Sequence, residues 1–474
     1  MKKRWLFCVV LCVFIGACAV NPVTGKKEFS LISEQQEIAL GQQTDQEIRG
    51  EYGVYADPAL EAYIASVGQA LVPHTHRPKL GYHFAVLDTP VINAFAVPGG
   101  YVYVTRGILA LMNTEAELAA VIGHELGHVN ARHSVRRMSN LMIAQIGLAV
   151  GSALSDSVAR ISGFASVGIQ LLFLKFSRDD EREADDLGVR YARGGGYNPG
   201  DMIAFFNSLE KMGDLSGKSA LPGFLSTHPL TRERIEKVKS LLAADDSRLA
   251  RKNEAYLRKV ENMVYGEDPR QGFIEGNAFH HPELRFSLDF PAGWKAQNTP
   301  TQVMMASQDG NAAVVLQAEK SAESLENYAN KVAEKIEGRQ FLNDQRESIH
   351  GFTAYHQVYQ VTQQNREPLK ARLSFVRKGK FIFTFTALST AGGFNGFEGS
   401  FRSIVGSFRE LTNPAVLGRQ PQRLRLVRSG GAESLQNIFR REGVQKDSWT
   451  KLAILNDLDV AAVPAKNSLI KIVK

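Results

Sequence analysis

The segment Ile122–His128, with the sequence IGHELGH, constrains the fold of this chain more than any other stretch. Two histidines lie four residues apart, and a glutamate directly follows the first. On a helix such residues share one face, with their Cβ atoms about 5–6 Å apart. His124 and His128 can therefore hold one zinc ion, and Glu125 can reach a water on that ion without being a ligand. A zinc site needs a further protein ligand, so another segment must meet this helix face.

One source of a third ligand is excluded by the residues that follow the motif. The metzincin pattern needs Gly at position 131 and His at position 134. This chain has Ala131 and Ser134, and His133 is one residue away from the required place. We interpret His133 as a surface residue or as a residue that supports a ligand from behind.

A second source of a ligand lies 53 residues downstream, in SRDDEREADDLG, Ser177–Gly188. In a helix Glu181 and Asp185 lie on one face, whereas Glu183 faces elsewhere. This arrangement lets one carboxylate bind zinc while the other orients a ligand histidine. The alternative is an acidic, solvated helix start, because carboxylates stabilise the first turn of a helix. Combined with the histidine motif, the metal site is the favoured interpretation.

The first 17 residues indicate export rather than folded structure. MKKRW is basic, LFCVVLCVFI is a short apolar run, and small residues precede Cys18, the order found in export signals. IGAC resembles a bacterial lipoprotein box with Cys18 as the acylated residue; a plain signal peptide or an uncleaved anchor is the alternative. The cysteines are Cys8, Cys12 and Cys18 alone, so the mature chain would have neither a disulfide nor a free thiol, which excludes thiol catalysis.

The net charge of +7 falls to +4 without the three leader cations Lys2, Lys3 and Arg4, which gives no reason to expect nucleic-acid binding. With 474 residues, of which 44% are hydrophobic, the chain exceeds one ordinary core. We predict an α+β multidomain protein: a leader at 1–17, a mainly helical domain with a small sheet and the candidate zinc site at 18–268, an α+β domain at 278–411, and a small βααβ domain at 420–474.

Local signals predict the elements of the first domain. Ser33 with Gln36, and Asp57 before Pro58, are helix starts, and Thr114 begins one long helix over 114–137. Residues 82–88 and 101–105 read as strands, with a Pro98-Gly99 turn before the second. The apolar stretch 138–176 is interrupted by Asp156 and Arg160, which predicts small-residue-rich helices near the site rather than a membrane span. In 283–410, strand signals alternate with one clear helix, SLENYANKVAEKIEG.

Three motifs together resemble a known family. HELGH, SRDDEREAD and STHPLTRERI are similar to the HtpX- and BepA-like zinc metallopeptidases, which include the CAAX prenyl endopeptidase, over roughly residues 30–260. The resemblance implies one zinc ion held by His124, His128 and Glu181, Glu125 as general base, and Asp185 bonded to a ligand histidine. The chain lacks the flanking spans of the membrane-embedded members, so it resembles a soluble, exported branch.

The same resemblance implies two further site elements. In NAFAVPGG, Asn93, Ala94, Phe95 and Ala96 correspond to an edge strand that pairs with substrate backbone. In STHPLTRERI, His228 and Arg234 correspond to a histidine and an arginine near the zinc. Either they stabilise the oxyanion, or His228 occupies the fourth zinc position at rest as a latch that substrate displaces.

The C-terminal residues RLRLVRSGGAESLQNIFRREGVQKDSWTKLAILNDL resemble a LysM module, whose members bind N-acetylglucosamine-containing glycans such as peptidoglycan. GAESL replaces the usual Gly-Asp-Thr-Leu, and Pro464-Ala465 replaces Pro-Gly, so glycan binding stays open.

We therefore expect a lipid-anchored, periplasmic zinc endopeptidase, on the outer membrane because Ala19 rather than Asp follows Cys18, acting on unfolded or misassembled envelope proteins. The alternatives are a non-proteolytic assembly factor or chaperone, and a wall-binding scaffold, each retaining the zinc site.

Overall fold

The computed structural model describes residues 18–151, 175–216, 223–362 and 367–474. The chain divides into two compact units, one formed by the residues up to Gly266 together with Gln422–Lys474, and the other by Glu267–Pro421. The predicted leader, 1–17, and most of the apolar stretch 138–176 lie outside the described residues. The protein is a mixed α+β multidomain chain, as the sequence predicts.

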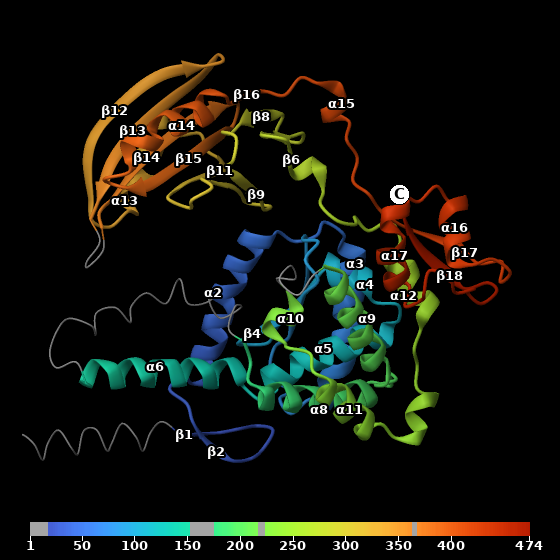
Figure 1. The fold of residues 1–474 in the computed structure, drawn as a ribbon. Helices are drawn as coiled ribbons and strands as arrows, with labels where there is room; N and C mark the ends of the chain where they lie inside the picture. Colours follow the sequence, from blue (N-terminus) through green and yellow to red (C-terminus); the bar gives the residue numbers. More distant parts are fainter. Residues whose placement is uncertain (1–17, 152–174, 217–222, 363–366) are drawn as a thin grey trace, which may run out of the picture. The chain divides into compact units, whose positions relative to one another are not determined.

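The first unit is mainly helical around one three-stranded sheet (Figure 1). Its elements up to Gly266 are β1 (Cys18–Val20), β2 (Lys27–Phe29), α2 (Glu34–Tyr52), α3 (Pro58–Leu71), η1 (Val72–His74), β3 (His83–Leu87), β4 (Ala94–Val97), β5 (Tyr101–Thr105), α4 (Arg106–Leu111), α5 (Glu115–Asn130), α6 (His133–Gly151), α8 (Arg178–Gly194), α9 (Asp201–Ser216), α10 (Phe224–Thr227), α11 (Arg232–Leu241), η4 (Ala244–Arg248) and α12 (Asn253–Val260).

The predicted helix starts are confirmed by their hydrogen bonds. Ser33 and Gln36 form a reciprocal capping box at α2, and the Asp57 carboxylate accepts the first free amides of α3. Thr114 accepts the amide of Glu117 at the start of α5. These side chains satisfy amides that have no partner within the first turn of a helix.

The small sheet has the order β3-β5-β4. β3 runs parallel to β5, whereas β4 is antiparallel to it, with Ala94 opposite Val104 and Ala96 opposite Val102. Among the described residues, β4 therefore pairs with β5 on one side, and its other side is a sheet edge. Edge strands present backbone amides and carbonyls to a further extended chain.

The prediction of one long helix over 114–137 is wrong. α5 ends at Asn130, and α6 begins at His133. Between them Arg132 has a φ of 55°, in the left-handed region that a continuing right-handed helix does not use. The Arg132 guanidinium donates to the Glu37 carboxylate at 2.9 Å and to the Ile32 carbonyl at 2.9 Å, which holds this break against α2.

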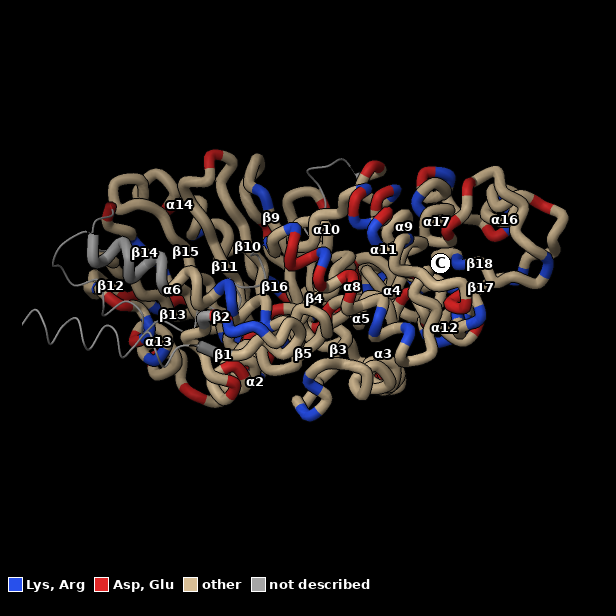
Figure 2. Tube along the Cα trace, turned by 90° about the horizontal axis from the view of Figure 1, so that it is seen from below, with Lys and Arg blue, Asp and Glu red and all other residues tan. Residues whose placement is uncertain are grey.

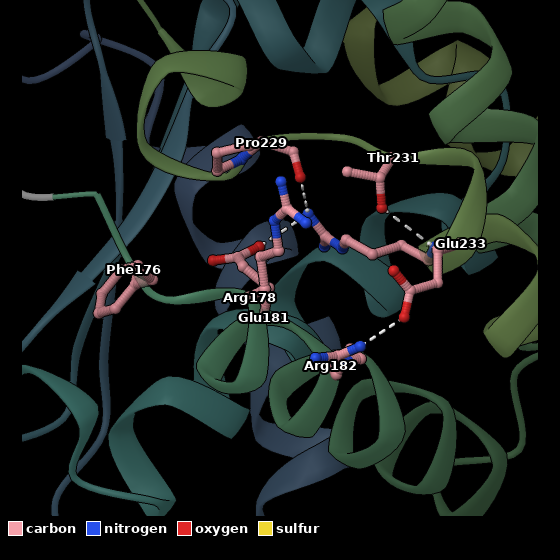
Figure 3. A pocket seen from close by; sticks show the side chains of 8 residues that line it. Phe176, Arg178, Glu181, Arg182, Pro229, Thr231 and Glu233 are labelled. Carbon is pink, nitrogen blue, oxygen red and sulfur yellow. Dashed lines mark hydrogen bonds and ion pairs between the residues drawn. The ribbon is translucent and has the colours of Figure 1, made fainter.

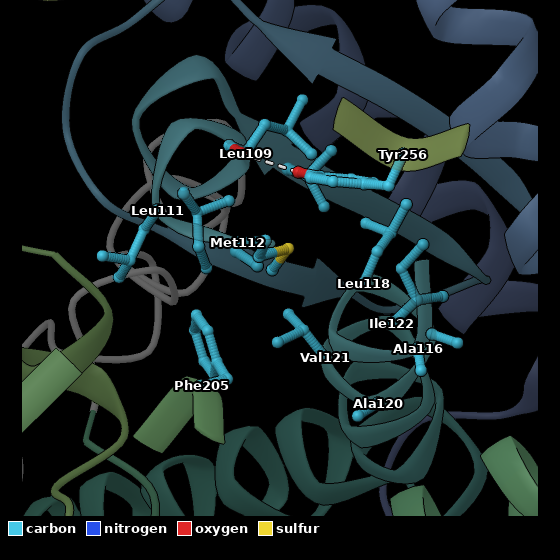
Figure 4. Close-up of a cluster of buried hydrophobic side chains, with 14 of the residues drawn as sticks. Leu109, Leu111, Met112, Ala116, Leu118, Ala120, Val121, Ile122, Phe205 and Tyr256 are labelled. Carbon is cyan, nitrogen blue, oxygen red and sulfur yellow. Dashed lines mark hydrogen bonds between the residues drawn. The ribbon is translucent and has the colours of Figure 1, made fainter. Parts of the chain in front are cut away.

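Helix α5 passes through the middle of the core of the first unit (Figure 4). Leu118, Val121 and Ile122 on α5 belong to the same buried cluster as Phe205 of α9. The hydroxyl of Tyr256, from α12, donates to the Leu109 carbonyl at 2.7 Å, so even the large polar side chain in this cluster has a partner. The helix that carries the histidine motif is thus enclosed by well-packed elements.

The second unit contains two antiparallel sheets, with strand orders β12-β13-β14-β15-β11-β10-β9 and β16-β8-β7-β6. Helix α13 (Leu325–Glu334) corresponds to the helix predicted from the segment SLENYANKVAEKIEG. The sequence did not reveal α14, whose glycines give low helix propensity; Phe394, Phe401, Ile404 and Val405 stabilise it by packing. The elements are η5 (Pro269–Gln271), β6 (Phe273–Glu275), β7 (Ala278–His281), β8 (Phe286–Asp289), β9 (Lys295–Asn298), β10 (Gln302–Ala306), β11 (Ala312–Lys320), α13 (Leu325–Glu334), β12 (Arg339–Ile349), β13 (Phe352–Val361), β14 (Leu369–Lys378), β15 (Phe381–Thr390), α14 (Phe394–Gly406), β16 (Arg409–Glu410) and α15 (Pro414–Leu417).

The C-terminal tail has the predicted order of strand, two helices and strand. It consists of β17 (Leu424–Arg428), α16 (Leu435–Arg441), η6 (Lys446–Ser448), α17 (Trp449–Leu455) and β18 (Leu469–Val473), with β17 and β18 antiparallel. Leu424, Phe439 and Ile472 belong to the same buried cluster as α5. The tail and the histidine-bearing domain therefore share one hydrophobic core.

Opposite charges are interspersed on the outer helices of the first unit (Figure 2). Glu254 of α12, for example, lies 2.8 Å from the Arg428 guanidinium of β17 and 3.4 Å from that of Arg258. Among the residues described, none of the helices combines the length and the apolar character that crossing a membrane requires.

A buried lysine joins the tail to the domain that carries the histidine motif. Lys471 of β18 is fully buried, and its ammonium donates to the Ala110 and Met112 carbonyls, at 2.8 Å each. These carbonyls lie at the C-terminal end of α4, where a helix has unpaired acceptors and favours a cation. Burial lowers the pKa of Lys471, and the Glu117 and Asp457 carboxylates oppose that shift.

We predict that Lys471→Met lowers the free energy of unfolding by about 3 kcal/mol, because it leaves buried carbonyls and Glu117 without their cationic partner. Urea unfolding followed by circular dichroism measures the change. Lys446→Met, at an exposed position of the same tail, is the matched control. Equal unfolding curves for the two variants would contradict the role of Lys471.

Candidate metal centre

Helices α5 and α8 cross so closely that glycine is favoured at the contact. A Cβ added to Gly123 would lie 3.1 Å from the Gly188 carbonyl oxygen, and one added to Gly127 would lie 3.0 Å from the Ala184 Cα. A Cβ on Gly188 would lie 3.0 Å from the His124 amide nitrogen. The glycines of IGHELGH and of the acidic segment therefore allow the two predicted ligand segments to meet.

Four side chains converge where the helices cross. His124, His128, Glu181 and His228 are all buried, and one ligand atom from each lies within 4.8 Å of the others. The Nε2 atoms of His124 and His128 are 3.1 Å apart, and the His228 Nδ1 is 2.9 Å from Glu181 Oε1 and 3.3 Å from His124 Nε2. Glu181 Oε1 is 3.5 Å from His128 Nε2.

These separations fit a tetrahedral metal ion. Ligand atoms at the zinc distance of about 2.0–2.1 Å from one centre lie about 3.3–3.4 Å from each other. Burial alone would raise the pKa of Glu181, but His228, His128 and His124 outweigh it and hold the pKa below its ordinary value. This direction favours the ionised form, which a carboxylate ligand of a metal ion requires.

Asp185 and Arg234 contact the ligand residues on the side away from the cluster of ligand atoms. Asp185 Oδ1 lies 3.0 Å from His124 Nδ1, the ring nitrogen that points away from the other ligand atoms. The Arg234 guanidinium donates to both oxygens of Asp185 at 2.7 Å and lies 2.7 Å from Glu181 Oε2. Arg234 thus fixes the carboxylate behind one histidine and the carboxylate ligand together.

Sequence reasoning gave no definite place to His133 and set Glu183 apart from the site. The His133 Nδ1 lies 2.8 Å from the His128 Nδ1, and its Nε2 lies 3.1 Å from the Glu183 carboxylate. His133 is 1% exposed, so the surface interpretation is wrong and the supporting interpretation fits the geometry. Sequence reasoning could not place His133 because no local motif predicts the break after α5.

Two aromatic side chains enclose the histidines, and sequence reasoning missed both. The ring of Phe176 stacks on His128 with centroids 4.0 Å apart, and Phe224 stacks on His228 with centroids 4.6 Å apart. Phe176 also lines a pocket beside the site, together with Glu181 and Pro229 (Figure 3). In this pocket Arg182 is paired with Glu233 rather than with the ligand carboxylate.

Glu125 differs from the other buried groups because neither carboxylate oxygen has a hydrogen-bond partner among the described residues. Its Oε1 lies 3.7 Å from His228 Nε2. Burial raises the pKa of Glu125, while His228 and His124 oppose the increase. Leaving a buried carboxylate without partners costs free energy, which indicates a role in chemistry rather than in stability.

The predicted substrate strand lies beside this carboxylate. The Ala96 backbone amide, in β4, is one of the groups that lower the pKa of the Glu125 carboxylate. Asn93 precedes the strand, accepts the Thr105 amide at 3.1 Å, and has a buried side-chain oxygen without a hydrogen-bond partner in the described chain. The free edge of β4 and the ligand cluster therefore belong to one region of the first unit.

Comparisons with known proteins agree with this geometry. Residues 58–242 match the model of Peptidase family M48. The chain is 32% identical over 253 residues to the beta-barrel assembly-enhancing protease of Escherichia coli O157:H7, a match that covers 50% of this chain and 51% of that protein. It is 29% identical over 225 residues to the mitochondrial metalloendopeptidase OMA1 of Schizosaccharomyces pombe, covering 47% and 65%.

The chain thus spans about half the length of the beta-barrel assembly-enhancing protease that it matches. Within the matched region, the family model and the buried ligand group together support a zinc metalloendopeptidase with zinc as its cofactor.

We predict that Arg234→Gln weakens zinc binding by about 10–100-fold, because Glu181 and Asp185 lose the guanidinium that orients them. Competition with a chromophoric chelator measures the dissociation constant. Arg232→Gln, at an exposed position on the same helix, should bind zinc like the parent. Unchanged affinity in Arg234→Gln would mean that Arg234 does not position the ligands.

Proposed function

We propose that this protein is a zinc-dependent endopeptidase of the bacterial cell envelope that cleaves unfolded or misassembled envelope proteins. The observation that carries the proposal is the tetrahedral group of buried ligand atoms beside Glu125, a buried carboxylate without a partner in the described chain. A structural zinc site needs no such carboxylate, because it holds no water that must give up a proton.

The roles of the residues follow from their positions. His124, His128 and Glu181 would hold zinc, which supplies a Lewis acid and lowers the pKa of a water in its open position. Glu125 would act as the general base, accepting a proton from the attacking water, and would then donate that proton to the leaving amine. The free edge of β4, at Ala94–Val97, binds the substrate as an added strand and so accepts many sequences.

His228 is the fourth member of the group of ligand atoms. Its Nδ1 lies at hydrogen-bond distance from His124 and Glu181, so it occupies the fourth corner of the ligand group. We infer that His228 excludes water until substrate displaces it, and that its ring then stabilises the oxyanion. Arg234 contributes by holding Glu181 and Asp185, because its guanidinium donates hydrogen bonds to Asp185 and to the Pro229 carbonyl and forms an ion pair with Glu181.

The location and the substrate class rest on the leader and on the similar proteins. Cys18 follows a leader of the lipoprotein type, which supports a lipid anchor facing the periplasm, on the outer membrane. The name of the beta-barrel assembly-enhancing protease supports substrates that arise during envelope assembly. The βααβ tail supports an additional contact with peptidoglycan through its LysM-like order of elements.

We predict that Glu125→Gln keeps one zinc per chain but lowers casein hydrolysis by about 10²–10⁴-fold, because all ligands remain while the proton acceptor is lost. Metal analysis and hydrolysis rates are measured on the same preparation of the mature protein. Glu210→Gln, an exposed change on α9, is the matched control. A mutant that cleaves as fast as the parent would exclude Glu125 as the general base, whereas a parent that binds zinc without cleaving casein would favour a non-proteolytic assembly factor.

We predict that His228→Ala cleaves casein faster and less selectively while still binding zinc, because its removal opens the fourth position to water. Initial rates and zinc affinity are compared with the parent. Loss of activity with zinc retained would assign His228 to oxyanion stabilisation without a latch. Unchanged activity and unchanged affinity would exclude both roles.

A further inference from the structure

The break between α5 and α6 brings together two histidines that a continuous helix would separate. In such a helix, residues five apart are rotated by about 140° around the axis, so their side chains leave on different sides. Here His128 and His133 are five apart, yet their Nδ1 atoms lie 2.8 Å from each other. The left-handed backbone at Arg132, with a φ of 55°, makes this contact possible.

The break is held in place by specific bonds. Asn130 donates to the Leu126 carbonyl at 2.6 Å and accepts the Arg77 amide at 2.7 Å. The Arg132 guanidinium bonds to Glu37 and Ile32. A residue other than glycine in the left-handed region of backbone conformations costs free energy, and these bonds stabilise Arg132 in that conformation. The contact between the two histidines is therefore a fixed feature of the fold.

The Nε2 atom of His133, on the ring edge away from His128, faces two carboxylates. Its Nε2 lies 3.1 Å from Glu183 Oε2 and 3.7 Å from Asp180 Oδ1, both on α8. Arg136 forms an ion pair with Asp180 and therefore holds the second carboxylate. His133 is 1% exposed, whereas the Glu183 side chain is 26% exposed, so the chain of bonds runs from the buried site to the edge of solvent.

The positions of the protons follow from this order. The His128 Nε2 faces His124 and Glu181, so a metal ligand at this position carries its proton on Nδ1. That proton is donated to His133 Nδ1, which must then be an acceptor. His133 consequently carries its own proton on Nε2 and donates it to Glu183, the acceptor that ends the chain.

We propose that His133 and Glu183 form a positioning relay that fixes the tautomer and the ring orientation of the metal ligand His128. The proposal rests on the zinc site of the proposed function. The two ligand histidines are then held differently: His124 bonds directly to a carboxylate, Asp185, whereas His128 reaches its carboxylate through a second imidazole. Such partners behind a ligand raise zinc affinity by orienting it.

The test compares zinc dissociation constants, measured by chelator competition on the full mature chain. His133→Leu removes both bonds at similar volume and should weaken zinc binding about 10–100-fold. His133→Asn keeps an acceptor oxygen near the place of Nδ1 and should recover part of that loss. Glu183→Ala should weaken binding as well, while Asp186→Ala, at an exposed position on the same helix, should bind like the parent.

Non-additivity separates a relay from general loosening of the fold. His133→Leu combined with Glu183→Ala should bind zinc no more weakly than His133→Leu alone, because both act on one chain of bonds. Cobalt-substituted parent and variants should differ in their visible absorption, since the orientation of one ligand changes. Additive losses, or parental affinity in His133→Leu, would overturn the relay.

Two controls keep the result interpretable. If His133→Leu does not fold, the half-buried Glu183→Ala and the visible spectrum of its cobalt form decide the question; parental affinity with a parental spectrum overturns the relay. Failure of the proposed function has a different signature: the parent itself would bind no zinc, or would bind zinc without hydrolysing casein.

Discussion

The close crossing of α5 and α8 is the contact on which the rest of the first unit depends. A Cβ at Gly123, Gly127 or Gly188 would lie 3.0–3.1 Å from backbone atoms of the other helix, so larger side chains there would push the two helices slightly apart. At this separation the histidines of one helix and the carboxylates of the other face a common point. The glycines of the motif therefore favour the close approach on which the site depends.

That approach concentrates ionisable groups in a buried place, which is unfavourable unless they are paired. Each buried carboxylate but one has a partner: Glu181 lies beside His228 and Arg234, and Asp185 beside His124 and Arg234. Arg234 can contact both carboxylates because its planar guanidinium carries several N–H donors in a fixed arrangement. Glu125 is the exception: among the described residues neither of its oxygens has a hydrogen-bond partner, and the His228 Nε2 lies 3.7 Å from its Oε1. A buried carboxylate without hydrogen bonds among well-bonded neighbours is most simply explained by the reaction it serves.

The outer parts of the unit support α5 rather than stand apart from it. The tail contributes Phe439 and Ile472 to the core that surrounds the helix, and Lys471 ends on the carbonyls of α4. On the opposite flank, α2 holds Arg132 and thereby the break after α5. Sequence-distant segments therefore converge on the helix that carries His124, Glu125 and His128, and they limit how far its side chains can move.

The sequence by itself determined the local features: the caps at Ser33, Asp57 and Thr114, the strands β3 and β5, the α+β second unit and the spacing of His124, Glu125 and His128. These depend on neighbouring residues alone. Helical spacing pointed to the Glu181 and Asp185 pair, but only the resemblance chose Glu181 as the ligand and suggested His228, because both lie too far from the motif for periodicity to connect them. Tertiary structure alone decided the break at Arg132, the contact of His133 with His128 and the docking of Lys471. Each depends on bonds between segments far apart in the chain, and such bonds can override local helix preference.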